Sequence, residues 1–175
     1  MAINGRRKGN KAERVAAKLI SDWTGHKFER TPSSGGLQWK ASHAKGDITA
    51  TDEHRCPFCF EVKSYAKIDF SHLINPKIKN PDILQYWSQA SRDAGKVNKI
   101  PMLMMRYNGL PKSFYFIVLE RRFWKKVRVE LGSFNYLIFS GMNQLVILPS
   151  TEFFKVNYKF IRKIAKTYLN ESKRK

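Results

Sequence analysis

Apolar side chains recur at helical spacing near the N-terminus and predict a helix over residues 9–23. At about 100° per residue, its apolar face comprises Ala12, Val15, Ala16, Leu19 and Trp23. Gly25 is well placed to end this helix. The next segment, residues 28–46, is rich in Ser, Gly and Pro, which predicts a loop or a short strand with a mobile end.

Shorter apolar runs separated by turn residues predict strands along the rest of the chain. The first two runs, residues 46–51 and 59–65, are joined by the polar turn 52–58. Two more runs, residues 102–107 and 113–119, flank a turn at Asn108-Gly109. Weaker strands are predicted at residues 136–140 and 144–148.

Two further helices are predicted between and after these strands. One starts at Asn80-Pro81, ends at Gly95 and buries Ile83, Trp87, Ala90 and Ala94. The other spans residues 151–169 and places Lys155, Lys159, Arg162, Lys163 and Lys166 in one arc, opposite Phe153, Phe160, Ile164 and Tyr168. The sequence therefore predicts a single α/β domain over residues 1–175, with a central mixed sheet flanked by helices and with basic ends.

The charge of the chain indicates the kind of molecule that it binds. The chain has a formal net charge of +19, and its pI of about 10.1 favours a polyanionic partner, most simply nucleic acid. No stretch approaches the roughly 20 apolar residues that span a bilayer, and the N-terminus lacks the apolar core of a signal peptide. With two cysteines, these features predict an intracellular protein of a prokaryote or a virus. A non-catalytic binder that acts by charge alone remains an alternative.

Two neighbouring predicted strands carry the residues suited to catalysis. Side chains alternate along a strand, so Glu61 and Lys63 project to one side while Val62 points into the core. If the two strands pair, Asp47 lies beside Glu61, and a divalent cation such as Mg²⁺ would hold both carboxylates ionised. Lys63 would orient or deprotonate the attacking water and stabilise the charge on phosphorus. An ordinary strand with a surface salt bridge is the alternative for Glu61-Val62-Lys63.

A helix that carries Glu13, then Gly46-Asp47, then Glu61-Val62-Lys63 resembles the PD-(D/E)XK nuclease superfamily, with the restriction-endonuclease-like fold. Gly46 stands where the family usually has Pro. Within that superfamily, residues 8–65 resemble archaeal and phage Holliday-junction resolvases, on the segments KGNKAER, RTPSSGG, GDI and FEVKSY. The resemblance extends more loosely to ILQYWSQASRDAG and IPMLMMRY.

This resemblance implies roles for individual residues. Asp47, Glu61, the Val62 carbonyl and Glu13 would bind Mg²⁺ or Mn²⁺, and Lys63 would be the catalytic lysine. Related nucleases often place a Gln near the metal from the following helix. Gln85, Gln89 and Arg92 share a helix face, and Gln89 is the expected catalytic residue, although a solvated polar face explains the same spacing. The implied enzyme is a homodimer that cleaves four-way DNA junctions.

Several basic or hydroxyl residues are expected to bind DNA rather than to catalyse. Arg121, Arg122, Lys125 and Lys126 surround Phe123 and Trp124, a pattern suited to phosphate contacts plus base stacking. The remaining members of this set are Arg6, Arg7, Lys8, Arg30, Ser33 and Ser34, together with the arc of Lys155, Lys159, Arg162, Lys163 and Lys166. For the basic clusters, the alternative is a solvated surface, and for the two serines it is a flexible linker.

Two alternatives remain open at this stage. Cys56 and Cys59, with His43 or His54, have the spacing of half a zinc knuckle, although packed thiols are the simpler interpretation. The chain could also be a nicking, restriction-type or repair nuclease on the same fold, because nothing in the residues themselves selects a junction.

Overall fold

The computed structural model describes residues 5–31, 45–52, 55–73, 75, 77–78, 81–140 and 144–172. The helices are α1 (Gly5–Thr24), η1 (Phe70–Leu73), α2 (Asp82–Lys96), α3 (Arg121–Val127), η2 (Arg128–Glu130), α4 (Ser150–Phe153) and α5 (Tyr158–Ser172). The strands are β1 (Phe28–Arg30), β2 (Ile48–Ala50), β3 (Phe58–Tyr65), β4 (Ile100–Tyr107), β5 (Phe116–Glu120), β6 (Leu137–Phe139) and β7 (Leu145–Pro149).

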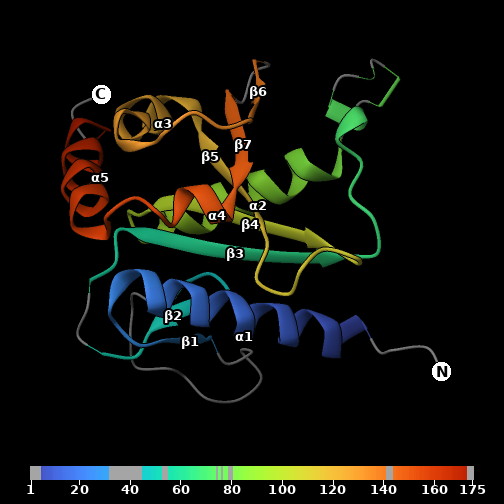
Figure 1. Cartoon of the computed structure of the whole chain (residues 1–175), viewed down its shortest axis with the longest axis horizontal. Coiled ribbons are helices and arrows are strands. Elements are labelled where there is room, and N and C mark those ends of the chain that lie inside the picture. Colours follow the sequence, from blue (N-terminus) through green and yellow to red (C-terminus); the bar gives the residue numbers. More distant parts are fainter. Residues whose placement is uncertain are drawn as a thin grey trace.

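The strands form one mixed sheet in the order β1-β2-β3-β4-β5-β7-β6. Among the described strands, β3 and β4 are the one parallel pair. A parallel pair needs a crossover connection, and α2 supplies it. The expected α/β architecture, a mixed sheet flanked by helices, is confirmed, including the two weaker strands at the edge (Figure 1).

Helices cover both faces of the sheet and bury two separate apolar clusters (Figure 1). One cluster joins α1, α3, α4 and α5 to side chains such as Phe60, Val62 and Met104. The other joins α2 to Leu103 and Met105. Because side chains alternate along β3 and β4, Glu61 and Lys63, paired with Leu103 and Met105, lie on the α2 face.

The ends of α1 and α2 differ from expectation by a few residues. α1 begins at Gly5 rather than residue 9 and ends before Gly25, whose φ of +74° supplies the expected left-handed turn. α2 begins at Asp82 after Pro81 and continues through Gly95. The left-handed residue after α2 is Asn98, with φ of +51°, an amino acid that tolerates this conformation. Gly95 as the end of the helix is therefore wrong.

The predicted C-terminal helix is broken into α4 and α5. Asn157 accepts a hydrogen bond through Oδ1 from the Lys159 amide at 2.8 Å, which is the geometry of an N-cap that starts a new helix. The Trp23 indole donates to the Val156 carbonyl at 2.8 Å and fixes the break against α1. Lys155 therefore lies outside the helix that carries the other four basic residues, and the single basic arc is wrong.

Among the described residues, no helix is both long enough and apolar enough to cross a bilayer.

Candidate active site

The candidate site lies where the middle of β3 faces α2. Glu61 is 3% exposed, although it is a carboxylate. Tyr86, Gln89 and Asp93 follow one another at helical spacing along α2. Tyr86 and Gln89 contact Lys63, while Asp93 raises the pKa of Glu61 electrostatically. The polar residues of β3 therefore face this row of α2 side chains.

Lys63 is held from three sides. Its Nζ lies 2.6 Å from Oε1 of Glu61, donates to Oε1 of Gln89 at 3.1 Å, and stands 5.6 Å from the centroid of the Tyr86 ring. Burial opposes the charge of this ammonium, but contact with Glu61 and the charge of Asp47 outweigh it and raise the pKa of Lys63. The residue is therefore a fixed cation.

Asp47 reaches the same strand from the end of β2. Its amide donates to the Phe60 carbonyl at 2.8 Å, and its Oδ2 accepts from the Val62 amide at 2.7 Å. The antiparallel pairing of β2 with β3 thus brings Asp47 to the strand that carries Glu61 and Lys63, as the sequence predicted.

Gly46 makes this approach possible. Its φ is +86°, and a Cβ at this position would lie 2.4 Å from the Phe60 carbonyl oxygen. Proline, whose φ is fixed at about −65°, cannot adopt that backbone. The glycine in place of the usual proline is thus required by this path of the chain.

The surroundings of both carboxylates disfavour their charged forms. Burial, followed by the charge of Glu61, raises the pKa of Asp47 to about 7, against the opposing effect of the Val62 hydrogen bond. Burial also raises the pKa of Glu61, although Lys63 opposes the change and Asp93 and Glu13 add to it. The buried Glu61 and the half-buried Asp47 together form a favourable place for an added positive charge.

Comparison with known proteins identifies the family of the chain. The family model described as "Phage putative PDDEXK endonuclease" matches residues 4–167. The chain belongs to this nuclease family. It is also 33% identical over 110 residues to Protein D14 of Escherichia phage T5, in an alignment that covers 61% of this chain and 66% of that protein. The chain therefore spans slightly less than two thirds of this relative's length. No solved structure matches the chain.

The nuclease's own residues fit a hard divalent cation. Mg²⁺ typically takes one or two carboxylates together with waters and a substrate phosphate oxygen. Oε1 of Glu61 is buried and lacks a partner in hydrogen-bond geometry, despite its close ionic contact with Lys63. Over the described ranges, no three His, Cys, Asp or Glu side chains form a complete metal cage. Asp47 and Glu61 nevertheless supply two carboxylates, which lies within the one or two that Mg²⁺ typically takes from a protein.

Glu13 lies on the α1 face of the sheet, opposite the α2 face on which Glu61 and Lys63 lie. Its Oε2 accepts a hydrogen bond from Nε of Arg30, and both side chains are largely buried. Arg30 pairs with Ile48 in the sheet, whose side chain packs in the α1 cluster, so the pair belongs to the α1 face. Glu13 still raises the pKa of Asp47 electrostatically. The structure thus gives Glu13 an arginine partner and places Arg30 in an internal ion pair.

The basic cluster on α3 is arranged differently from the expectation. Phe123 and Trp124 are 0% and 2% exposed, so the expected stacking of bases on these rings is wrong. Arg122 lies 5.7 Å from the Tyr168 ring centroid, and Lys126 pairs with Glu171 at 3.0 Å. Both basic residues thereby attach α3 to α5.

Other expected DNA-binding residues vary in exposure. The exposed side chains are Lys125, Lys155, Lys159, Lys163 and Lys166, whereas Arg121 and Arg162 are half-buried. Lys155 is paired with Glu152 at 2.8 Å. Ser33 and Ser34, and the side chains of Arg6, Arg7 and Lys8, lie outside the part of the chain that is described.

The two cysteines are separate, buried thiols. Cys56 packs in the α1 cluster, while Sγ of Cys59 donates to the Lys45 carbonyl at 3.4 Å. Burial raises the pKa of both thiols, that of Cys59 to about 12. Packing thus accounts for both cysteines, and His43 and His54 lie outside the described residues.

Sequence reasoning missed the aromatic side chains beside Lys63. Tyr86 stacks on Tyr65 with ring centroids 5.0 Å apart and planes 12° apart. The polar face chosen from the sequence, with Gln85 and Arg92, is exposed, while Gln89 alone of those three faces β3. The spacing of Tyr86, Gln89 and Asp93 was the available signal for the face that meets β3.

Proposed function

We propose that this nuclease hydrolyses phosphodiester bonds of branched DNA with Mg²⁺ or Mn²⁺, most specifically as a Holliday-junction resolvase. The observation that carries the catalytic part is the buried Glu61–Lys63 ion pair at 2.6 Å, on the same strand that hydrogen-bonds Asp47. The junction preference is supported by the resemblance of residues 8–65 to resolvases.

Asp47, Glu61 and the Val62 carbonyl would hold the metal. The N–H and C=O of one strand residue point to the same edge, and the Val62 N–H points to Asp47. The Val62 carbonyl is therefore directed to that side, just beyond Ile48, the first residue of β2. When bound, the metal would supply positive charge to a phosphate oxygen.

Lys63 would position the attacking water and stabilise the additional charge on phosphorus. A raised pKa keeps Lys63 protonated at neutral pH, which favours charge stabilisation and water orientation over a role as the base. Gln89 would act as a positioning residue, because its Oε1 accepts from Nζ of Lys63 and limits the directions in which the ammonium can point.

Glu13 would act at the margin of this site. Glu13 is held in an ion pair with Arg30. It would bind the metal or its waters directly only if this ion pair breaks when DNA binds. Arg30 would then be released toward the phosphate backbone, which joins its expected DNA-binding role to that of Glu13.

Phosphate contacts would come chiefly from the exposed lysines of α3 and α5. The net charge of +19 supports binding to a polyanion. The aromatic residues of α3 would contribute to the core alone, since both are buried.

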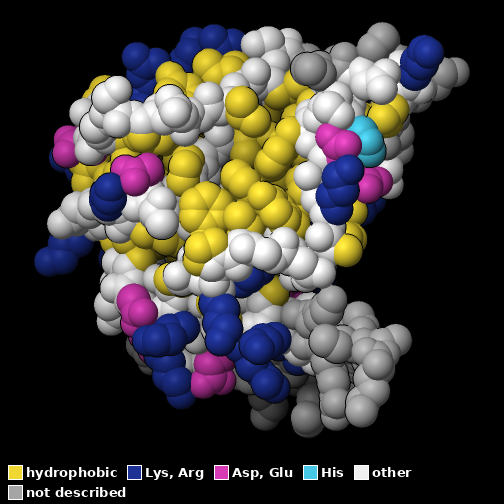
Figure 2. Space-filling view, turned by 45° about the vertical axis from the view of Figure 1, so that its right-hand side comes forward, with side chains coloured by type: hydrophobic (Ala, Val, Ile, Leu, Met, Phe, Trp, Pro, Cys, Tyr) yellow, Lys and Arg dark blue, Asp and Glu magenta, His cyan; other side chains and the backbone are white. Residues whose placement is uncertain are grey.

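A two-fold dimer would suit a two-fold junction, and β6 is the surface that we assign to it. β6 is an edge strand on which Leu137 is 51% and Ile138 is 45% exposed. Residues 131–151 carry no charged side chain, so two strongly basic copies could approach there with the least repulsion. Figure 2 shows apolar side chains across the centre of one face, with Lys and Arg mostly toward its margins.

The deciding experiment compares cleavage of a four-way junction, a flap and a linear duplex of matched sequence, with Mg²⁺, with Mn²⁺ and with EDTA. We expect metal-dependent cutting that strongly favours the junction. Preferred cutting of flap or duplex would identify a repair, nicking or restriction-type nuclease instead. DNA binding without cleavage under every condition would indicate a non-catalytic binding protein.

A further inference from the structure

A pocket of about 200 Å³ opens immediately beyond the candidate active site, at the C-terminal end of β3. Its walls come from Tyr65, the segment that follows β3, η1 and the first turn of α2. In sheets with parallel strands, ligands tend to bind outside the carboxyl ends of those strands, and β3 belongs to the parallel pair. The pocket therefore occupies a favourable position for substrate.

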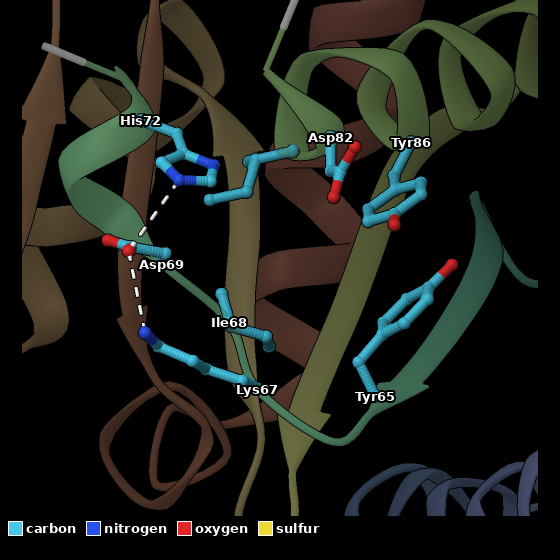
Figure 3. Close-up of a pocket in the computed structure, with 8 residues that line it drawn as sticks. Tyr65, Lys67, Ile68, Asp69, His72, Asp82 and Tyr86 are labelled. Carbon is cyan, nitrogen blue, oxygen red and sulfur yellow. Dashed lines mark ion pairs between the residues drawn. The ribbon is translucent and has the colours of Figure 1, made fainter. Parts of the chain in front are cut away.

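Aromatic rings connect the pocket to the catalytic lysine. Nζ of Lys63 lies 5.6 Å from the centroid of the Tyr86 ring, and Tyr86 also stacks on Tyr65. Both rings line the pocket. Figure 3 shows the two rings on one side of the hollow and Asp69, His72 and Lys67 on the opposite side. Tyr86 thus belongs both to the pocket and to the surroundings of Lys63.

The charge of the pocket is unusual for this protein. Asp69 and Asp82 both line it, with Lys67 and His72, in a chain with an excess of basic residues. Hydrogen bonds from the Ser71 hydroxyl and amide lower the pKa of Asp69, so this carboxyl stays ionised at neutral pH. Oδ2 of Asp69 lies 3.8 Å from Nζ of Lys67 and 3.6 Å from Nε2 of His72, so its charge is partly offset. Carboxylate oxygens can accept further hydrogen bonds, and the N–H groups of a nucleobase are suitable donors.

A metal ion is a poorer occupant than a base. Where the chain is described, no group of three His, Cys, Asp or Glu side chains could hold a metal. The apolar side chains of Ile68 and Ile83, which also line the pocket, suit the flat face of a ring. Enzymes that act on extruded bases combine aromatic or apolar walls with hydrogen bonds to the base edge in this way.

We propose that this pocket receives an unpaired nucleobase of the DNA substrate, next to the phosphodiester that faces Lys63. The base lies against the Tyr65–Tyr86 pair and Ile68, and it directs its N–H groups to Asp82 and Asp69. This inference rests on the proposed function and adds a contact that favours DNA with a base free to leave the stack, as at a branch point.

The first test measures cleavage of substrates in which one base at a time is removed as an abasic site. For the wild-type protein, one position near the cut should show a loss of about 5- to 100-fold, the range expected for one base–aromatic stack. Tyr65→Leu should reduce that ratio of intact to abasic rates to within about twofold, while Tyr65→Phe, which keeps the ring, should retain it. The ratio within each variant cancels any general effect on catalysis.

The second test examines the carboxylates. Bases that carry an exocyclic amino group should be favoured over thymine at the sensitive position, and Asp82→Asn should flatten this preference. Asp22→Asn is the matched control, because Asp22 is an exposed carboxylate of α1 that pairs with Lys18. An unchanged preference in Asp82→Asn would remove Asp82 from the site.

The third test requires no activity. 5-Iodo-2′-deoxycytidine is placed at each position of a junction, bound to Asp47→Asn and irradiated, and the adducts are located by mass spectrometry. We expect one position to crosslink to Tyr65, Tyr86 or His72. If the wild-type protein cuts DNA but no position is abasic-sensitive and no pocket adduct forms, the pocket proposal fails while the nuclease stands. If no DNA is cut with either metal, the proposed function fails, and the crosslink alone decides the pocket.

Discussion

The Val62 amide donates to Oδ2 of Asp47 at 2.7 Å, so this acidic side chain is tied to the backbone between Glu61 and Lys63. One hydrogen bond therefore fixes the distance between the end of β2 and the residues of β3 on which catalysis would depend.

Asp47→Asn should abolish cleavage and leave DNA affinity nearly unchanged. The amide oxygen can still accept from Val62, so the strand pairing survives, but the negative charge needed for a divalent cation is lost. Affinity depends mainly on Lys and Arg contacts to phosphates. Cleavage in Mg²⁺ and binding by fluorescence anisotropy provide the two measurements, and parental cleavage by the variant would exclude Asp47 from the mechanism.

The stability of the metal-free protein should fall with pH because of Asp47. Its pKa is about 3.8 as a free side chain and about 7 in the folded protein, so the folded state binds more protons between these values. The contribution of Asp47 to the stability is therefore fully present below about pH 4, and it is lost as the pH rises to about 7. In EDTA, Asp47→Asn should exceed the wild type in free energy of unfolding at pH 8 by roughly 4 kcal/mol, and the difference should vanish near pH 4. Denaturant titrations check this, and equal pH profiles would contradict the buried ionised carboxylate.

Lys63→Ala should slow single-turnover cleavage by about 100-fold or more, because a fixed charge is removed from the reacting phosphate. Lys63→Arg keeps the charge, but its planar fork is bulkier and donates in fixed directions. We therefore expect it to fold and bind DNA and still to cleave poorly. Near-parental single-turnover rates for both variants would rule out the catalytic lysine. Lys18→Ala is the matched control, because Lys18 is an exposed lysine of α1 that pairs with Asp22 and is outside the expected DNA-binding set.

Gln89→Ala should lower the rate of the chemical step by about 10-fold, since it removes one of the groups that orient Lys63 and about 1.4 kcal/mol corresponds to that factor. Gln85→Ala removes the same kind of side chain from an exposed position of the same helix and should have little effect on the rate. Comparable losses in both variants would mean that α2 is merely perturbed.

Ile138→Lys should convert the proposed dimer to monomer, because it places two additional charges at a two-fold contact between edge strands. Sedimentation velocity measures the state of association. Val129→Lys is the control, since Val129 is 73% exposed outside the sheet. A monomeric wild-type protein, or a dimer unaffected by Ile138→Lys, would contradict β6 as the contact.

Local patterns were enough to predict the sheet and the meeting of Asp47 with β3, because alternation and short turns act between neighbouring segments. The side chains that complete the site depend on tertiary packing. The polar pattern selected Gln89, which contacts Lys63, but it grouped Gln89 with the exposed Gln85 and Arg92 instead of with Tyr86 and Asp93. The basic residues of α3 looked like a binding surface, whereas Phe123 and Trp124 between them are core.

The break before α5 had a local signal that was overlooked. Asn157 is a good N-cap residue, and its side chain caps the Lys159 amide, but the basic residues on both sides continue the periodicity through it. The partner of Glu13 lacked such a signal, because Arg30 is brought to it by the pairing of β1 with β2.

Gly46 also changes how the family signature should be compared between members. Gly46, the residue before Asp47, contributes no side chain to the chemistry. Its identity depends only on the backbone conformation that the chain needs to pass the Phe60 carbonyl. Proline cannot adopt the φ of +86° found at Gly46, whereas glycine can also adopt the φ of about −65° that proline requires. A proline at this position would therefore disrupt this protein, and a search pattern that demands proline would pass over enzymes whose chemistry is intact.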